Sequence, residues 1–357
     1  FINQRIKFIM AYTTINKSGN YFNTVTYTGN GNAGHSITGV GFQPDWTWVK
    51  NRSDTYGHNL VNSVTNTLMF SNANAPEEAI GNTVTSFDSD GFTVGTNAGV
   101  NANGQNLVSW NWLGSNTTAA NTDGSINSTV SANTTSGFSI VSYTGNQTSG
   151  ATVGHGLGSK PEMIIFKERN GTASWVVYHN KNTSAPATQY LQLNSTNATG
   201  TYAGYFNNTE PTSSVFTLGN DTGINQSGDT YIAYCFAEKQ GYSKFGSYVG
   251  NGNADGSFIY TGFKPAFVMI KLSSAANENW AMYDNKRDTF NSETTQQLRA
   301  NSSSTESAST SEVNLLSNGF KVNDSNAEIN AAGSTYIYMT FAEAPLVGTN
   351  NVPCTAR

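Results

Sequence analysis

The stretch Gly262-Phe-Lys-Pro265-Ala-Phe-Val-Met-Ile-Lys271 joins a Gly-Pro turn directly to a hydrophobic strand that ends at a lysine. The same pattern, Gly-x-x-Pro followed six positions later by Lys, stands at residues 41–50 and again at 158–167. A spacing that is kept three times predicts one structural unit used three times, because internal repeats decide the architecture of a chain before any local feature does.

The recurring prolines and lysines mark fixed places in this unit. The prolines are expected just before their strands, where a missing amide hydrogen does least harm to the strand ladder. Apolar residues on both faces of the strands predict a central strand that is covered from both sides. Each lysine is expected at the strand end, reaching for solvent along its alkyl stem. These structural repeat positions are Pro44, Lys50, Pro161, Lys167, Pro265 and Lys271.

Other landmarks recur in the same order in each copy, and they set the length of the unit. The opening tyrosines Tyr27, Tyr143 and Tyr248 are 116 and 105 residues apart. This period is too long for a solenoid repeat of roughly 20–50 residues and predicts three tandem domains. The expected organisation is an N-terminal arm at 1–20, repeats at 21–114, 137–238 and 239–345, a polar linker at 115–136 and a C-terminal tail at 346–357.

The predicted secondary structure is almost wholly strand. Runs rich in Val, Ile, Thr, Tyr, Phe and Trp are bounded by Gly, Asn, Asp and Pro, and long segments with a helical period are absent from the sequence. The predicted fold class is therefore all-β, with three tandem antiparallel domains of β-sandwich or jelly-roll type.

The composition limits the classes of partner. Only 11% of the 357 residues are charged, against about 25% in an average soluble domain, and the net charge is -5. The sequence has no basic stripe, which argues against nucleic-acid binding. No apolar run approaches the length of a membrane span. A surface of neutral hydrogen-bonding groups suits extracellular or particle-bound life.

The chain ends and the cysteines carry little information. The first nine residues make a poor signal peptide. Met10, followed by Ala-Tyr-Thr-Thr, would make a natural start, which would leave those residues as an upstream extension. Cys235 lies in an apolar run and is expected to be a buried thiol. Cys354 is close to the C-terminal end, so no disulfide framework is predicted.

No residue is assigned to catalysis, a cofactor or a metal. None of the four histidines belongs to a Gly-x-Ser-x-Gly motif, and paired acids at fixed offsets do not recur in the copies. The stretch Asp88-Ser-Asp-Gly91 departs from an EF-hand after its first positions and reads as a turn. His/Cys clusters typical of zinc sites are missing from the sequence. A hydrolase formed by carboxylates that are distant in sequence is left open.

Sugar binding is the chemistry that the composition favours, because exposed aromatic rings beside amides make stacking platforms. Two equivalent strands carry a Trp and a Tyr three positions apart, which point to opposite faces, so that only one of each pair is expected in the core. The alternative is that these rings fill the sandwich and the seams between repeats. The candidate glycan-binding residues are Trp175, Tyr178, Trp280 and Tyr283.

The repeat also resembles a known module. Residues 242–253, 260–267 and 336–345, together with 39–46 of the first copy, are similar to a repeated β-rich module in virion proteins of tailed bacteriophages, especially marine ones. The resemblance covers nearly the whole chain from Met10. It implies a structural or fibre-like appendage on a virion, located on the extracellular particle, and assigns no catalytic residue.

Three hypotheses follow. The first is a non-enzymatic virion protein, fibre-like or decoration-like, that attaches to host surface polysaccharide through many weak contacts. Its partners would be other virion proteins and copies of itself, a homotrimer by analogy with phage fibres. The second is a tail depolymerase that cuts the surface polysaccharide. The third is an architectural protein that cements capsid or tail subunits.

Overall fold

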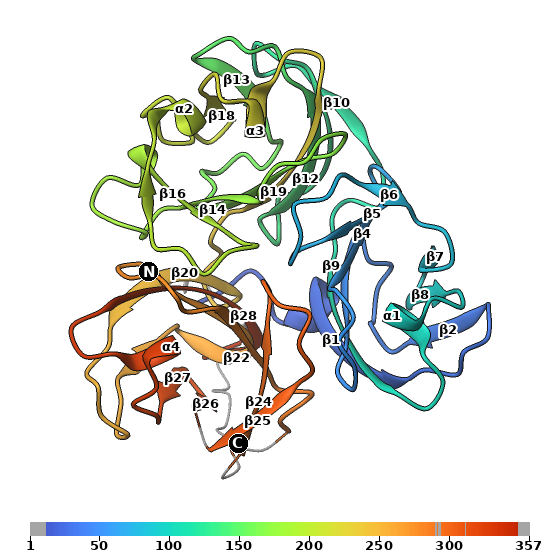
Figure 1. The fold of residues 1–357 in the computed structure, drawn as a ribbon, viewed down its shortest axis with the longest axis vertical. Helices are drawn as coiled ribbons and strands as arrows, with labels where there is room; N and C mark the ends of the chain where they lie inside the picture. The colour runs from blue at the N-terminus through green and yellow to red at the C-terminus, as the bar shows by residue number, and fades with distance from the viewer. Residues whose placement is uncertain (1–11, 290, 292–293, 311, 349–357) are drawn as a thin grey trace, which may run out of the picture.

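The computed structural model describes residues 12–289, 291, 294–310 and 312–348, which are built predominantly of β-strands. The prediction of an all-β chain of antiparallel strands is confirmed. Met10 and Cys354 lie outside the described residues. The chain forms three lobes around a common centre, coloured blue, green to yellow, and orange to red along the sequence (Figure 1). None of the helices in the described parts has the length and apolar character that crossing a membrane requires.

The first repeat is preceded by one 3-10 turn, η1 (Ser18–Asn20), and contains two sheets and one short helix. Its large sheet has the order β1 (Phe22–Thr28), β9 (Asn106–Trp112), β3 (Trp46–Asn51), β4 (Asn59–Asn62), β5 (Thr67–Phe70), β6 (Glu78–Ala79). Its small sheet has the order β2 (His35–Thr38), β8 (Gly91–Val94), β7 (Val84–Asp88). The helix is α1 (Ala98–Asn101).

The second repeat has the same strand order in its large sheet, extended at one edge. The order is β10 (Ala119–Asn121), β11 (Ser128–Asn133), β12 (Phe138–Thr144), β19 (Thr230–Phe236), β14 (Met163–Glu168), β15 (Val176–His179), β16 (Gln189–Gln192), β17 (Gly200–Thr201). The small sheet pairs β13 (Ala151–Gly154) with β18 (Val215–Leu218). The helical segments are η2 (Pro186–Thr188), α2 (Ala203–Phe206) and α3 (Thr222–Asn225).

The third repeat returns to the pattern of the first. Its large sheet has the order β20 (Ser243–Val249), β28 (Thr335–Pro345), β22 (Phe263–Leu272), β23 (Trp280–Asp284), β24 (Thr294–Arg299), β25 (Ser307–Thr310). Its small sheet has the order β21 (Phe258–Tyr260), β27 (Gly319–Val322), β26 (Val313–Leu316), and its helix is α4 (Ala327–Asn330).

The turn after each opening tyrosine explains part of the repeated sequence. A Cβ atom on Gly29 would lie 2.2 Å from the carbonyl oxygen of Ala102, so only glycine allows this approach. The next residue, Asn30, donates its backbone N–H to the Asn101 side chain at 2.9 Å. Asn225 and Asn330 accept the equivalent bonds at 2.9 Å in the other two repeats. The Gly-Asn pair therefore ties the first long strand to the short helix.

Two of the three repeated prolines lie where the sequence predicts them. Pro44 and Pro161 precede β3 and β14 by two residues. Pro265 is a correction, because it lies inside β22 and not before it. The pairing of β22 with β28 shifts register on both sides of this proline. The irregularity accommodates a residue that has no amide hydrogen to donate to the ladder.

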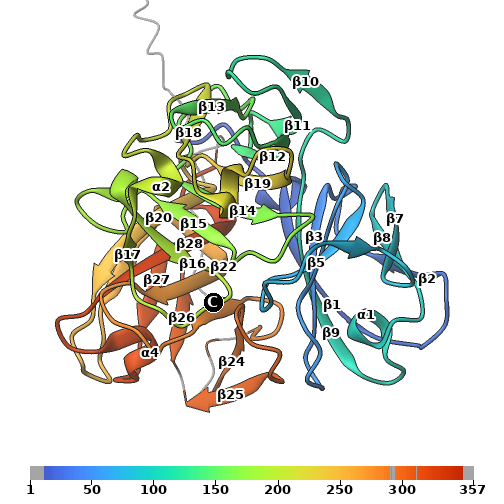
Figure 2. The same cartoon turned by 45° about the horizontal axis from the view of Figure 1, so that its top comes forward.

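The segment 115–136, predicted as a polar linker, is also corrected. It contains β10 and β11, and β11 pairs with β12 over six residues, with Val130 opposite Val141. Figure 2 shows both strands extending the edge of the second repeat's large sheet. Val130 is buried in the core of that repeat, whereas its neighbour Thr129 is exposed. The alternation is hidden in the sequence because small polar residues occupy most of the strand.

Each large sheet has a buried face on both sides. One face packs with the small sheet and helix of its own repeat, and these contacts form three separate cores. The opposite faces of all three large sheets meet in one central aromatic core. There the Trp46 ring stacks on Tyr234 of the second repeat at 4.2 Å, and Phe22 stacks on Phe341 of the third at 4.9 Å. The central core binds the three repeats into one body.

Candidate functional site

The predicted sugar-stacking tryptophans are buried between repeats. Trp175 and Trp280 are 0% and 2% exposed. The indole N–H of Trp175 donates to the carbonyl oxygen of Phe70 in the first repeat at 2.9 Å. That of Trp280 donates to Gln192 in the second repeat at 2.9 Å. A buried ring offers no face to a sugar, so the structure corrects this assignment and supports the alternative that these rings fill the seams.

The two predicted tyrosines are buried as well, on the opposite face of the same strands. Tyr178 and Tyr283 belong to the cores of the second and third repeats. The Tyr283 hydroxyl donates to a Glu312 oxygen at 2.7 Å. The expectation that only one ring of each Trp-Tyr pair could be core is wrong. Each large sheet is covered on both faces, so both rings of a pair are interior.

The three repeated lysines do not reach solvent. Lys50, Lys167 and Lys271 are all 0% exposed. Each ammonium group donates to backbone carbonyls, and the shortest of these bonds, to Asn51, Glu168 and Glu278 respectively, measure 2.6, 2.7 and 2.7 Å. Burial lowers the pKa of all three lysines to about 8. The prediction of solvent-directed side chains is wrong because the neighbouring repeat covers the strand end.

The lysines lie at three equivalent seams, named here by the repeats that meet: seam 1–2, seam 2–3 and seam 3–1. One backbone hydrogen bond defines the equivalent place in each. The three bonds are Glu77 N–H to Arg169 O at 2.7 Å, Thr199 N–H to Ser273 O at 2.9 Å, and Glu306 N–H to Arg52 O at 2.9 Å. The repeats therefore contact one another head to tail around the centre.

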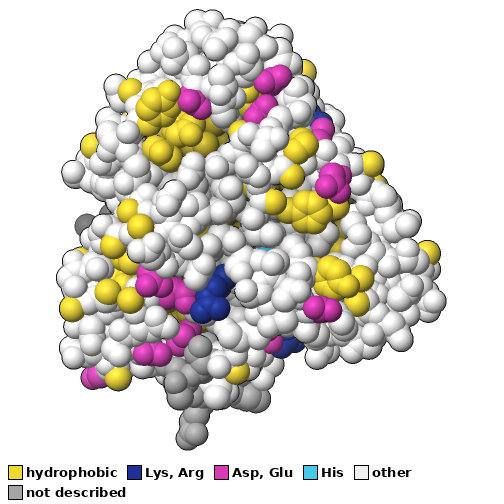
Figure 3. Space-filling view, viewed as in Figure 1, with side chains coloured by type: hydrophobic (Ala, Val, Ile, Leu, Met, Phe, Trp, Pro, Cys, Tyr) yellow, Lys and Arg dark blue, Asp and Glu magenta, His cyan; other side chains and the backbone are white. Residues whose placement is uncertain are grey.

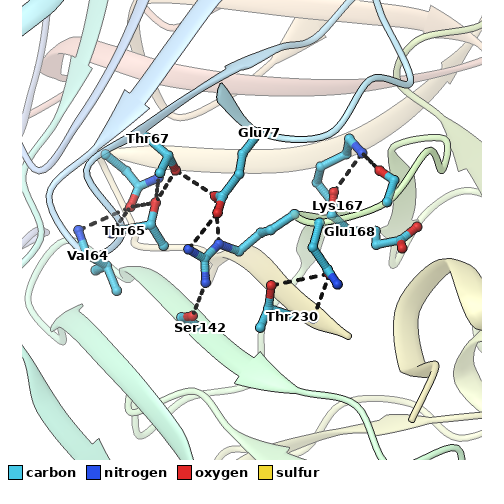
Figure 4. Close-up of polar contacts among 12 residues, drawn as sticks. Val64, Thr65, Thr67, Glu77, Ser142, Lys167, Glu168 and Thr230 are labelled. Atoms are coloured by element: carbon cyan, nitrogen blue, oxygen red, sulfur yellow. Dashed lines mark hydrogen bonds and ion pairs between the residues drawn. The ribbon is translucent and has the colours of Figure 1, made fainter. Parts of the chain in front are cut away.

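Two of the seams are closed by ion pairs. In seam 1–2, Arg169 donates to both carboxylate oxygens of Glu77, at 2.8 and 2.9 Å, and to the Ser142 hydroxyl at 3.3 Å. Figure 4 shows Glu77 among these contacts, with Ser142 and Lys167 nearby. In seam 3–1, Arg52 is bidentate to Glu306, with bonds of 2.6–3.0 Å. Such fork geometry gives both energy and register.

Seam 3–1 carries a further charge cluster that is largely buried. Arg287 donates to Asp284 at 2.6 Å and to Glu306 at 3.0 Å, with both side chains of the first pair 0% exposed. The indole N–H of Trp110 donates to the same Asp284 at 3.0 Å. Arg287 also lies over the Trp110 ring at 5.5 Å. This cluster links the first and third repeats.

The histidines serve the framework. His58 accepts a hydrogen bond from the Trp48 indole at 2.8 Å, and the ring of His179 contacts the carbonyl oxygen of Tyr338 at 3.1 Å. Burial lowers the pKa of His179 to about 4, so this ring is neutral at physiological pH. Among the described residues, no group of three or more His, Cys, Asp or Glu side chains gathers as a metal site would require.

The candidate functional site is a surface cluster of three tyrosines in the second repeat: Tyr190, Tyr202 and Tyr205, called here the tyrosine cluster. Tyr202 is 45% exposed. The Tyr205 ring meets those of Tyr190 and Tyr202 edge-on, at 4.7 and 5.1 Å. Figure 3 shows a hydrophobic patch on the surface in the part of the molecule where Figure 1 draws α2, with an acidic side chain at its edge.

Glycines set the rings against the backbone. A Cβ atom on Gly204 would come within 2.4 Å of the Tyr202 ring, and one on Gly200 within 2.6 Å of the Tyr190 ring. The rings can lie flat only because these two positions have no side chain. The cluster therefore presents aromatic surface that is held in place by its own loop.

Asp221 supplies charge at the edge of this cluster. Its carboxylate accepts the Gly223 N–H at 2.7 Å and so caps α3. The charge of Asp221, with a hydrogen bond to the phenol, raises the pKa of Tyr202. Burial, and then the same carboxylate, raises the pKa of Tyr205. Both phenols are therefore neutral hydrogen-bonding groups beside an aromatic surface, which is the chemistry that binds a sugar ring.

These three tyrosines were missed at the sequence level. The signal for two of them was the stretch Gly200-Thr-Tyr-Ala-Gly-Tyr205, in which glycine alternates with tyrosine in the second copy alone. The first and third repeats have a third strand in their small sheets, β7 and β26, whereas the second has a two-stranded small sheet and the helix α2. The tyrosine cluster therefore lies where the second copy differs from the other two.

The comparisons with known proteins concern the whole repeat array. No curated protein and no solved structure matches this chain. One family model covers residues 17–345, which includes all three repeats in a single match. The chain therefore belongs to the family described as "Domain of unknown function (DUF7483)".

Proposed function

We propose that this chain is a non-enzymatic structural protein of a phage particle, built of three β-sandwich repeats, that attaches the particle to host surface glycans. The resemblance of its repeats to virion modules supports the setting. The shared aromatic core and the two seams closed by ion pairs support a rigid appendage. Copies of the chain on one particle would multiply weak contacts into useful attachment.

The tyrosine cluster is the observation that carries the binding part of this proposal. Aromatic faces pack against the apolar faces of a sugar ring, and the phenol and carboxylate groups at the rim bond its hydroxyls. Tyr202 is one of only a few large hydrophobic residues that are exposed in the described part of the chain. Tyr190 and Tyr205 already contact one another and Tyr205 contacts Tyr202, so a ligand would not have to order these rings.

A glycan array tests the proposal. We expect the purified full chain to bind a subset of bacterial surface glycans, and Tyr202→Ala to weaken that binding by about tenfold, or roughly 1.4 kcal/mol. Tyr56 is 36% exposed in the first repeat and lies outside the cluster, so Tyr56→Ala is the matched control and should bind as wild type does.

Two results would contradict the proposal in different ways. Binding to no glycan on the array would favour an architectural cement protein. Shortening of host polysaccharide chains during incubation with the protein would favour a depolymerase. Chain length measured by size-exclusion chromatography separates attachment from cleavage, because attachment leaves the polymer intact.

A further inference from the structure

Seam 2–3 differs from the other two seams at the place where they carry their ion pairs. The residue equivalent to Arg169 and Arg52 is Ser273, and the residue equivalent to Glu77 and Glu306 is Thr199, as the shared backbone hydrogen bond shows. Two long charged side chains are thus replaced by two short hydroxyl side chains.

The space that the ion pair fills elsewhere is open here. A cavity of about 500 Å³ lies at this seam, within the roughly 300–1,000 Å³ of small-molecule sites. The second repeat contributes Asn182, Gln189 and Thr199 to its wall, and the third repeat contributes Ser247 and Ser273. Ser247 and the nearby Lys181 are exposed, so the cavity opens to solvent on that side.

The wall holds polar atoms that have no partner. Asn182 is 2% exposed, and its side-chain oxygen accepts a hydrogen bond from the Thr199 hydroxyl at 2.6 Å. Its amide nitrogen has no hydrogen-bond partner among the described residues, and neither has the side-chain oxygen of Gln189. Both atoms are covered in this conformation, so a ligand in the cavity would pair them only after the Asn182 and Gln189 side chains turn toward it.

We propose that this cavity is a saccharide-binding site that takes a single neutral sugar residue. A hydroxyl group both accepts and donates, so sugar hydroxyls can pair the Asn182 nitrogen and the Gln189 oxygen with small side-chain shifts. The other groups of the wall are hydroxyls, with Ala198 as the one aliphatic contact and Lys181 as the one cation among the described lining residues.

The same wall argues against other ligands. A phosphate group is usually held by arginine forks or several amides, and the described lining residues include no arginine. Glycoside cleavage needs two carboxylates across the scissile bond, and none of the described lining residues is acidic. The chemistry therefore favours binding without turnover. This site deepens the proposed function, and rests on it only for the natural source of the sugar.

Restoring the missing ion pair is the sharpest test. The double variant Ser273→Arg with Thr199→Glu copies seams 1–2 and 3–1, in which the same pair is accommodated by the same backbone contact. We expect it to fold and to fill the cavity. The probes are D-glucose, D-galactose, D-mannose and N-acetyl-D-glucosamine at millimolar concentrations, with the full chain observed by ligand-detected NMR and by calorimetry.

The expected result is saturable binding of at least one of these sugars by wild type, and its loss in the double variant. Should the double variant fail to fold, Ser247→Trp decides, because this exposed residue on β20 lies at the open side of the cavity. Absence of saturable binding by wild type overturns the proposal. Unchanged binding by the folded double variant, or by Ser247→Trp, overturns it as well.

Tyr202→Ala separates this proposal from the proposed function. Gln189 lines the cavity, whereas the next residue of β16, Tyr190, belongs to the tyrosine cluster, so the two sites lie on opposite faces of one strand. We expect Tyr202→Ala to weaken array binding by about tenfold and to keep the binding of free sugar. The double variant should keep any array binding that depends on the tyrosines alone.

Discussion

Seams 1–2 and 2–3 share the same backbone contact but differ in the side chains beside it. In seam 1–2 the pair of Arg169 and Glu77 fills the space between repeats, and in seam 2–3 the pair of Ser273 and Thr199 leaves a cavity. The backbone bond is 2.7 Å in the first and 2.9 Å in the second, so the frame is kept. The backbone contact between two repeats therefore forms without the ion pair. A seam that lacks the pair can serve as a binding site.

The largest effect is expected where a seam depends most on charge. Arg287→Met would leave the buried carboxylate of Asp284 without its ion-pair partner, whereas Glu306 would keep Arg52, and we expect a loss of about 3–5 kcal/mol of unfolding free energy. Urea unfolding measures it. Lys181→Met beside the open cavity of seam 2–3 is the control and should change stability by less than about 0.5 kcal/mol. Equal losses of unfolding free energy in Arg287→Met and Lys181→Met would show that seam 3–1 does not depend on charge more than seam 2–3 does.

The three buried lysines should make stability depend on alkaline pH. Their pKa is about 8 in the folded chain and about 10.4 when unfolded, so the unfolded chain binds more protons between these values. The contribution of the lysines to the unfolding free energy should therefore rise from pH 8 to pH 10, by roughly 2 kcal/mol for each lysine. Lys167→Met should remove about one third of this rise, which is the contribution of one lysine, as measured by urea unfolding at several pH values.

The control for the lysine prediction is Lys181→Met, which removes an exposed ammonium group and should keep the full rise. Burial also raises the pKa of tyrosines such as Tyr178 and Tyr234 and of the Cys235 thiol, so these groups bind protons more tightly when folded and lower stability within the same pH range. The lysine effect is therefore taken from the difference between wild type and Lys167→Met, in which that fall cancels. A difference that stays constant from pH 8 to pH 10 would contradict the burial of Lys167.

The smallest effect is expected from converting one seam into the other. Arg169→Ser with Glu77→Thr turns the ion pair of seam 1–2 into the residues of seam 2–3. Removing both charges together avoids an unpaired charge, so we expect a loss of only about 1–2 kcal/mol, from the lost hydrogen bonds and packing. Thermal unfolding measures the cost. A variant that no longer folds would show that the contact between the first and second repeats requires the ion pair.

Much of the fold was readable from the sequence, because the turn and strand signals are local. The Gly-x-x-Pro turn, the Gly-Asn turn after Tyr27 and the aromatic strands identified a triplicated β unit. The prediction failed for 115–136, where β11 is made of small residues that alone would not favour a strand. Its pairing with β12 supplies the hydrogen bonds that its side chains do not signal.

The candidate sites were less predictable, since exposure depends on what covers a strand. In the sequence, Trp175 and Tyr178 look like the aromatic residues of a sugar-binding surface. In the structure, Trp175 is buried in the central core and Tyr178 is buried beneath the small sheet of its repeat. Tyr202 carries no stronger signal in the sequence than they do. Its 45% exposure follows from the helix α2 and from the glycines that seat the rings.

Local sequence thus decided that the chain makes antiparallel strands in three similar units, since backbone turns and side-chain alternation act over a few residues. Only the packing of those units decided which residues are buried, which charges are paired and where a cavity is left. A lysine such as Lys271 looks like a solvated strand end until the neighbouring repeat brings its own carbonyl oxygen to within 3.3 Å of the ammonium group. Long-range contact of this kind carries no mark in a short stretch of sequence.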